Sequence, residues 1–203
     1  WAFKNNIWII SDELYEHLVY EGEKTPSPAI YDPELNNTIV VNGVAKAHAM
    51  TGWRVGWIIA NDEVISIAKK IQSHATSNVS NLSQIAATSA LQNGLEETNI
   101  MKEAFNKRRL SAFDIFNNIE NIKIAKPNGA FYLFPDISYY CNNKIKNASN
   151  SIEFCDWLLE EHYIAFIPGE VFGAEGYFRC SYALSENELS EGLKRFTEAV
   201  KDL

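Results

Sequence analysis

Apolar residues recur in two different patterns along this chain. Short apolar or β-branched runs occur at residues 6–10, 38–41 and 55–60, and such runs bounded by polar residues are typical of buried strands. Elsewhere apolar residues recur at the spacing of a helix face, which predicts helices. The predicted helices cover residues 62–74, 82–91, 96–118, 151–162 and 186–201. This alternation of strands and helices predicts an α/β protein.

A change in organisation falls within the longest predicted helix. Its apolar positions, which we expect to face a core, are Met101, Phe105, Leu110, Phe113 and Phe116. After it come a predicted strand at residues 129–135, a helix, a strand around Arg179 and a closing helix, which together suit a smaller α+β domain. We therefore expect one domain over residues 1–107 and a second over residues 108–203.

One lysine directly follows a predicted strand. Residues 42–56 read NGVAKAHAMTGWRVG, so Lys46 comes just past a β-branched run, where open α/β sheets bind their ligands. A lone lysine there is most often a solvated surface group. Here Met50 and Trp53 add apolar bulk that favours a neutral, reactive amine, and Arg54 has the planar fork that suits a phosphate. The segment predicts a reactive amine beside a phosphate site.

A carboxylate and a phenol follow another predicted strand. The run at residues 6–10 leads into SDELYE, which places Asp12 at the end of the strand and Tyr15 three residues later. Taken alone, Asp12 is better explained as the N-cap of a helix, and Tyr15 as a packing residue beneath a loop.

An arginine lies inside a predicted strand near the other end of the chain. Residues 177–183 read YFRCSYA, and an arginine such as Arg179 is costly to bury unless it meets an anion. That anion is either a carboxylate of the protein itself or a bound ligand. Upstream, residues 127–132 read PNGAFY, where Gly129 and Ala130 provide space rather than chemistry.

Together these segments resemble the class I and II aminotransferases, which are pyridoxal-phosphate enzymes of fold type I. The lysine segment fits the pattern S/A-K-x-x-x-M-T-G-W-R-x-G, and SDELYE contains the motif D-x-x-Y. FRCSYA and PNGAFY fit R-x-S-Y/F and P-x-G-A-F-Y/F. Ala45 stands where many relatives have a phosphate-binding serine, but bacterial aspartate aminotransferases, the branch that the chain most resembles, also have alanine there.

The resemblance implies roles for particular residues. Lys46 would form a Schiff base with pyridoxal 5′-phosphate and then move the substrate proton. Asp12 would keep the ring nitrogen protonated, and Tyr15 would contact the phenolic oxygen of the ring. Arg54 would bind the phosphate, and Arg179 would clamp the α-carboxylate of the substrate. His48, where an aromatic residue is common, is interpreted as a packed or solvent-facing imidazole.

The same resemblance implies a fold and an activity. Residues 1–107 would be the C-terminal part of the large α/β/α pyridoxal-phosphate domain, and residues 108–203 the small α+β C-terminal domain. Trp1–Lys4 looks like the tail of a helix, and the family's phosphate loop is absent, so we expect the C-terminal half of such an enzyme. The activity would be ping-pong transfer of an amino group between an amino acid, aspartate or glutamate by resemblance, and a 2-oxo acid, in a cytoplasmic homodimer.

Three alternatives stay open at this point. A prephenate or aromatic aminotransferase and a carbon–sulfur lyase share the fold, and so does the pyridoxal-phosphate-binding domain of some transcriptional regulators. The motifs above do not fix the side chain of the substrate.

Composition excludes other classes of function. A net charge of -8 without a basic cluster argues against nucleic acid as a partner, and no apolar stretch is long enough to span a bilayer. The three cysteines, Cys141, Cys155 and Cys180, are odd in number, so we expect reduced thiols. Neither the cysteines nor the four histidines have the spacing of metal ligands, so we expect no metal. The polar stretch at residues 142–150 predicts an exposed loop.

Overall fold

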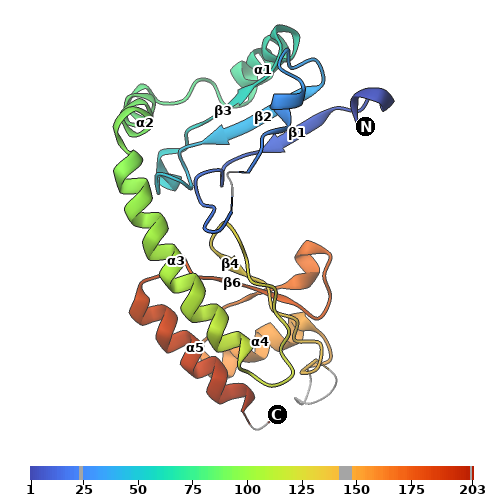
Figure 1. The fold of residues 1–203 in the computed structure, drawn as a ribbon, viewed down its shortest axis with the longest axis vertical. Helices are drawn as coiled ribbons and strands as arrows, with labels where there is room; N and C mark the ends of the chain where they lie inside the picture. The colour runs from blue at the N-terminus through green and yellow to red at the C-terminus, as the bar shows by residue number, and fades with distance from the viewer. Residues whose placement is uncertain (23–24, 142–147, 202) are drawn as a thin grey trace. The chain divides into compact units, whose positions relative to one another are not determined.

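The computed structural model describes residues 1–22, 25–141, 148–201 and 203. The chain divides into two units, residues 1–102 and residues 103–203, and the division falls inside helix α3 (Leu95–Asn117) (Figure 1). Both units combine helices with a sheet, which confirms the predicted α/β class. The domain boundary that we expected after residue 107 lies in the same helix and stays a prediction.

The first unit is built on a three-stranded sheet with the order β1-β2-β3. Strand β1 (Ile9–Asp12) pairs in parallel with β2 (Thr38–Gly43), so that Asp12 lies opposite Val41. Strand β3 (Gly56–Ile59) runs antiparallel to β2. All three strands lie in or beside the predicted apolar runs. Because β1 and β2 are parallel, their carboxyl ends meet at one edge of the sheet, and the loops that follow them start side by side.

Two glycines let β2 and β3 approach closely where the connection between them begins and ends. Gly43 pairs with Gly56. A Cβ atom on Gly43 would lie 2.9 Å from the carbonyl oxygen of Val55, and one on Gly56 would lie 3.1 Å from that of Asn42. These positions therefore favour glycine because of the space available. The connection that they close, residues 44–55, carries both Lys46 and Arg54.

The helices of the first unit follow the predicted periodicity. Helix α1 (Asp62–Ala75) begins at Asn61, whose Oδ1 accepts a hydrogen bond from the backbone of Val64 at 3.0 Å. After α1, Ser77 takes a left-handed backbone (φ 57°), which confirms the predicted break before α2 (Asn81–Asn93). None of the helices in the described part of the chain has the length and hydropathy of a bilayer-spanning segment.

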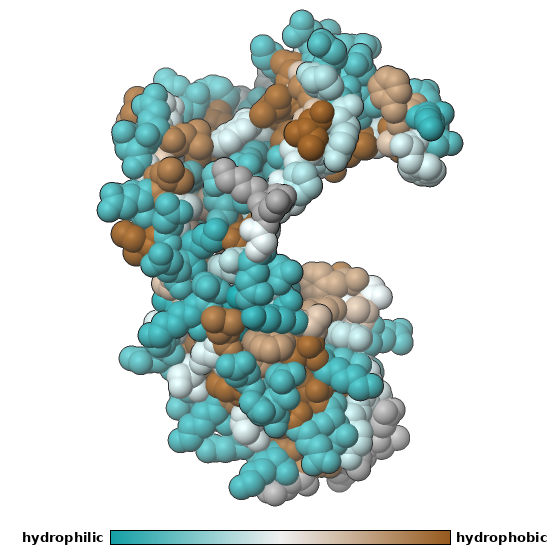
Figure 2. Space-filling model, in the orientation of Figure 1, coloured by the Kyte–Doolittle hydropathy of each residue, from teal (hydrophilic) through white to brown (hydrophobic). Residues whose placement is uncertain are grey.

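Much apolar surface of the first unit is exposed, as the brown patches over its strands and helices show in Figure 2. Ile10 is 70% exposed and Ile59 is 49% exposed, although both lie in strands. Other large exposed apolar residues are Trp8, Ile58, Ile67, Ile71, Leu82 and Ile85. Apolar surface on this scale typically marks a contact face.

The expected helix tail at the start of the chain is a short turn. Residues Phe3–Asn5 form the 3₁₀ helix η1, which ends where Asn6 takes a left-handed backbone (φ 53°). Two further 3₁₀ turns, η2 (Pro28–Tyr31) and η3 (Thr51–Trp53), lie in the connections that follow β1 and β2.

The second unit has an antiparallel sheet with the order β4-β6-β5. Its strands are β4 (Tyr132–Leu133), β5 (Ile167–Pro168) and β6 (Phe178–Ser181), and its helices besides α3 are α4 (Ser151–His162), α5 (Glu186–Val200) and the 3₁₀ helix η4 (Gly169–Phe172). The strand predicted at residues 129–135 is wrong in length, because Ala130 takes a left-handed backbone (φ 58°) and extended pairing begins only at Tyr132. The predicted helices in this unit are confirmed.

Most of the loop predicted at residues 142–150 lies outside the described residues. Of the remainder, Ser149 is exposed but Ala148 is buried, and Asn150 accepts a hydrogen bond from the backbone of Glu153 as the N-cap of α4.

The core of the second unit is a cluster of phenylalanine rings around Phe178. This residue of β6 is fully buried, and its ring stacks on Phe166 with centroids 4.3 Å apart. The rings of Phe196 in α5, Phe116 in α3 and Phe154 in α4 lie 5.5, 5.8 and 6.4 Å away. One strand residue therefore contacts all three helices of the unit, and aromatic pairs of this kind add to the energy of burial.

The buried face of α3 differs from the predicted one. The positions it buries within this unit are Phe105, Arg109, Ala112 and Phe116. Leu110, which we expected inside, is 36% exposed. Arg109 takes a core position because its charge is hydrogen-bonded: it donates to the carbonyl oxygen of Pro127 at 2.6 Å and to Oδ1 of Asn106 at 3.0 and 2.8 Å.

We expect Phe178→Ala to destabilise the second unit strongly. Removal of a fully buried ring that touches three helices should cost about 3–5 kcal/mol of the free energy of unfolding, measured by urea denaturation. The matched control is Phe3→Ala, since Phe3 is 67% exposed, and it should cost less than about 0.5 kcal/mol. Equal effects of the two substitutions would contradict the assignment of Phe178 to the centre of the core.

Candidate active site

Lys46 lies in a tight turn directly after β2. The backbone of Ala49 donates to the carbonyl oxygen of Lys46 at 3.2 Å, and Ala49 itself takes a left-handed conformation (φ 52°). The side chain of Lys46 is half-buried, and its Nζ lies 5.8 Å from the centre of the Tyr15 ring. The structure therefore brings the predicted amine and the predicted phenol together, from the loops after β2 and β1.

A buried hydroxyl group in α3 contacts this turn. Thr98 is 3% exposed, and its Oγ1 lies 3.0 Å from the carbonyl oxygen of Ala47 and 2.9 Å from that of Gly94, the residue just before α3. The same oxygen lies 3.2 Å from Nδ1 of His48. Thr98 thus holds the two residues that follow Lys46. Sequence reasoning missed it, because a single threonine in a helix gives no signal of a long-range contact.

Asp12 is the last residue of β1, and its side chain is exposed. Its Oδ1 accepts a hydrogen bond from the backbone of Leu14 at 3.2 Å, which forms a turn rather than the start of a helix. The helix N-cap alternative is therefore wrong. In the described part of the chain Asp12 has no salt bridge, so its carboxylate is available to a ligand.

Further hydrogen bonds join the loops that follow β1 and β2. The backbone of Glu13 donates to the carbonyl oxygen of Val41 at 2.8 Å, which extends the parallel pairing by one step. The amide of Asn42 donates to Oε1 of Glu16 at 2.6 Å, and its oxygen accepts from the backbone of Gly43 at 2.7 Å. Asn42 is a residue that the motifs did not single out, and it fixes the spacing of the Asp12 and Lys46 loops.

Arg54 ends the short η3 turn in the same connection as Lys46. It takes a left-handed backbone (φ 57°), is exposed, and donates from Nη1 to the carbonyl oxygen of Thr51 at 3.1 Å. Its remaining guanidinium donors can meet an anion such as a phosphate.

Arg179 belongs to the second unit, where its guanidinium lies against two aromatic rings. Its Cζ is 4.4 Å from the centre of the Tyr132 ring and 4.7 Å from that of Phe172. Among the described residues no carboxylate lies within salt-bridge distance of Arg179, so the alternative of an internal carboxylate partner finds no support. Contact with ring faces uses none of the N–H donors of a guanidinium, so those of Arg179 can meet an external anion.

Sequence motifs do not point to the second ring beside Arg179, that of Phe172. Phe172 precedes Gly173, whose left-handed backbone (φ 72°) ends η4, and a phenylalanine at such a turn is usually explained by packing. Here its ring is 47% exposed and lies 4.7 Å from the guanidinium carbon of Arg179.

Burial makes the three cysteines unreactive. Cys141, Cys155 and Cys180 are free and buried, and burial raises the pKa of each thiol to about 12. The nearby carboxylate of Glu170 also raises the pKa of Cys141 and Cys155. Within the described ranges no group of histidine, cysteine and acidic side chains is arranged to hold a metal ion.

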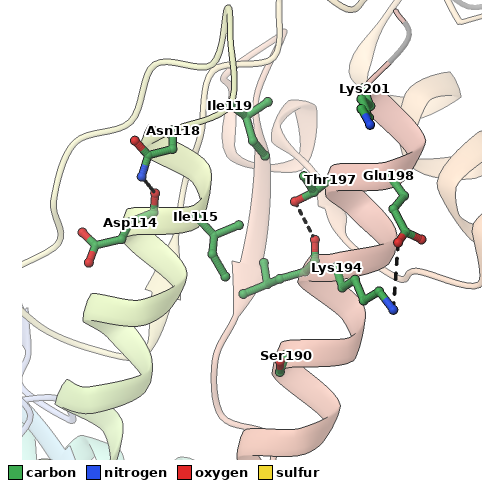
Figure 3. Close-up of a pocket in the computed structure, with 10 residues that line it drawn as sticks. Asp114, Ile115, Asn118, Ile119, Ser190, Lys194, Thr197, Glu198 and Lys201 are labelled. Atoms are coloured by element: carbon green, nitrogen blue, oxygen red, sulfur yellow. Dashed lines mark hydrogen bonds and ion pairs between the residues drawn. The ribbon is translucent and has the colours of Figure 1, made fainter.

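A groove of about 670 Å³ separates α3 from α5, and Figure 3 shows the side chains along it. Ile115, Ile119 and Leu193 form its apolar part, while Lys194 and Glu198 pair with each other at its rim at 4.0 Å. None of the predicted site residues lines it, so we do not assign it to the active site.

The sequence profile of the family described as "Aminotransferase class I and II" matches residues 2–196, nearly the whole chain. The chain belongs to this family. Its segments with Asp12, Lys46 and Arg179 therefore lie in an aminotransferase framework, as the motifs predicted, and the fold-type prediction is confirmed by solved relatives.

Individual relatives agree with this assignment. The chain is 43% identical to an aspartate aminotransferase of Streptomyces avermitilis, over all of this chain and 50% of the relative, and 38% identical to a probable aspartate/prephenate aminotransferase of Aquifex aeolicus, over 98% of this chain and 50% of the relative. The crystal structure of the aspartate aminotransferase from Rhizobium meliloti superimposes with a TM-score of 0.90 at 37% identity, over 98% of this chain and 50% of that one. The chain thus spans about half the length of the relatives it matches.

We expect the protonation of His48 to contribute to acid instability. Burial, and secondarily the imidazole of His17 (ring centroids 6.4 Å apart), lower the pKa of His48 below its ordinary value of 6.5. The unfolded chain then binds a proton before the folded one as the pH falls, so stability should decrease from about pH 6.5 down to the folded pKa and not further. An NMR titration of the imidazole should show protonation below pH 6.5.

The corresponding substitution is His48→Gln, which removes the titrating group. Urea denaturation between about pH 7 and pH 5 should give a flatter dependence of stability on pH for this variant. An unchanged dependence, or an imidazole that titrates above pH 6.5, would show that His48 is not desolvated in this way.

Proposed function

We propose that this chain carries the reactive lysine and the substrate anchor of a pyridoxal-phosphate-dependent aminotransferase. The enzyme would transfer an amino group between an amino acid, aspartate or glutamate, and a 2-oxo acid by a ping-pong mechanism. The observation that carries this proposal is the placement of Lys46 over the ring of Tyr15, next to the strand end that bears Asp12.

The residues present fit pyridoxal 5′-phosphate by their chemistry. Lys46 offers an amine for the aldehyde of the cofactor, and Asp12, which has no salt bridge with any residue that the structure describes, offers a carboxylate for its ring nitrogen. Tyr15 would donate to the ring oxygen, and Arg54 would bind the phosphate through its fork of donors. When bound, the cofactor supplies an electron sink for the carbanion at the substrate α-carbon.

The side chains of this chain would then position the substrate and move its proton. The amine of Lys46, once released, would take the proton from the α-carbon and return it, which is general acid–base catalysis. Arg179 would hold the α-carboxylate in a bidentate pair, which fixes the orientation of the α-carbon.

We also propose a domain division and an assembly. Residues 1–107 would belong to the large pyridoxal-phosphate domain and residues 108–203 to the small domain. The exposed apolar side chains of the first unit supply a surface on which a homodimer can form. The buried, reduced thiols suit a cytoplasmic enzyme.

A second candidate activity is the amination of prephenate or an aromatic 2-oxo acid. It is suggested by the name of the Aquifex aeolicus relative, a probable aspartate/prephenate aminotransferase, which covers both activities. A screen of amino donors and 2-oxo acids with the full-length protein separates the two, because only one class of acceptor should be turned over efficiently.

The first test of the proposal is Lys46→Ala in the full-length protein. Reduction with borohydride followed by mass spectrometry should locate the cofactor on Lys46 in the parent protein and find no covalent cofactor in the variant. Transamination should fall at least about 10³-fold, since general acid–base catalysis by itself is worth about 10²–10⁴. Lys70→Ala, on the exposed side of α1, is the control. Retained attachment and activity in Lys46→Ala would rule this lysine out.

The second test is Arg179→Lys, which keeps the charge but removes the bidentate fork. The KM of both substrates should rise at least about tenfold, equal to about 1.4 kcal/mol, while the cofactor stays bound. An amine substrate without a carboxylate, which reacts poorly in any case, should be unaffected. If that amine suffered as much as the amino acid, Arg179 would not be the carboxylate anchor.

A further inference from the structure

A buried serine ties together both ends of the segment that carries Phe172. Ser151, the first residue of α4, is fully buried. Its hydroxyl donates to Oε1 of Glu170 at 2.7 Å, and its backbone donates to the same oxygen at 3.2 Å. The hydroxyl oxygen of Ser151 in turn accepts from the backbone of Gly176 at 2.9 Å. One side chain thus contacts the segment 169–176 at η4 and again just before β6.

The backbone of this segment is closed on itself. Gly169 donates to the carbonyl oxygen of Tyr177 at 2.7 Å, and Ala174 donates to that of Gly169 at 3.0 Å. A Cβ atom on Gly169 would lie 2.8 Å from the carbonyl oxygen of Tyr177, so the two backbones are in direct contact. Because the segment is closely packed, a shift of Glu170 should also shift the residues beside it.

Phe172 depends on this segment for its position. It lies two residues after Glu170, and its ring is 47% exposed, with an edge-to-face contact to Phe134 at 5.9 Å. Few packing contacts hold a ring that is half exposed, yet this ring stands 4.7 Å from the guanidinium carbon of Arg179. Contacts that fix η4 therefore also fix Phe172, the ring beside Arg179.

One oxygen of the Glu170 carboxylate loses its hydration without gaining a hydrogen bond among the described residues. Its Oε2 is buried and has no hydrogen-bond partner among the described residues, which is unfavourable for a charged group. It makes no salt bridge with Arg179 within the described ranges, so it does not neutralise the guanidinium. The N-terminus of α4 offsets part of the cost through its dipole.

We infer that Ser151 and Glu170 are positioning residues for the carboxylate grip of Arg179, and that they act through η4 and Phe172. This inference rests on the proposed function, in which Arg179 binds the substrate. By fixing one of the two rings around the guanidinium, the Ser151–Glu170 pair orients its fork before the substrate arrives.

The test uses Ser151→Ala and Glu170→Ala in the full-length protein with its cofactor. Each should raise the KM of the amino acid and of the 2-oxo acid about tenfold, the value of one stacking contact of about 1.4 kcal/mol, with kcat changed less than about twofold. Calorimetry with succinate, a non-reacting dicarboxylate, should show the same weakening of Kd. Glu170→Gln keeps an acceptor oxygen for Ser151 and should restore most of the affinity.

A matched control separates positioning from helix stability. Glu153→Ala removes another carboxylate at the start of α4, one whose Oε2 accepts from the hydroxyl of Ser149 at 2.7 Å, and it should leave KM unchanged. In a Phe172→Ala background, Glu170→Ala should have no further effect on KM, because the residue through which it acts is gone.

Several outcomes would overturn the inference. They are an unchanged KM in Ser151→Ala and Glu170→Ala, a Glu170→Gln variant as weak as Glu170→Ala, an equal effect of Glu153→Ala, or additive effects of Glu170→Ala and Phe172→Ala. If Arg179→Lys raises KM in the same series, the proposed function stands and only the positioning role fails. If Arg179→Lys leaves KM unchanged, the substrate-site assignment itself fails.

Discussion

The parallel pairing of β1 with β2 is the constraint on which the proposed cofactor site depends. Parallel strands end at the same edge of a sheet, so the loops that bear Asp12 and Lys46 begin side by side although many residues separate them in sequence. Hydrogen bonds such as that from Asn42 to Glu16 then set the spacing of the two loops. The buried Thr98 hydroxyl fixes the turn after Lys46 from a third element. The register of β1 and β2 therefore determines where the proposed site residues lie, more than the conformation of any one loop does.

In the second unit the guanidinium of Arg179 is half-buried, and no carboxylate among the described residues neutralises it. An internal carboxylate would satisfy Arg179 but would also occupy the donors that, in the proposed function, bind the substrate. The rings of Tyr132 and Phe172 stabilise the charge by cation–π contact, which uses none of the N–H donors of the guanidinium. The aromatic core around Phe178, the strand neighbour of Arg179, gives β6 the rigidity that this arrangement requires.

Sequence patterns located the helices, the strands and the motif residues, because periodicity and local motifs reflect local physics. They failed where a tertiary contact overrides a local rule. Arg109 occupies a core position on α3 and displaces Leu110 to the surface, which follows from acceptors on Asn106 and Pro127 that no helical pattern reveals. The predicted strand at residues 129–135 is too long for a local reason, the left-handed backbone of Ala130. Thr98 and Phe172 were missed because each acts through contacts with distant segments.

The buried thiols have a practical consequence for experiments on this protein. Because the pKa of Cys141, Cys155 and Cys180 is about 12, only on the order of one in ten thousand of these thiols is ionised to the thiolate at pH 8. Maleimide and iodoacetamide reagents attack the thiolate, so the native cysteines should stay silent in the folded protein. A single cysteine introduced on the surface could then carry a fluorophore or a spin label without replacement of the native three, and two such labels could measure distances in solution.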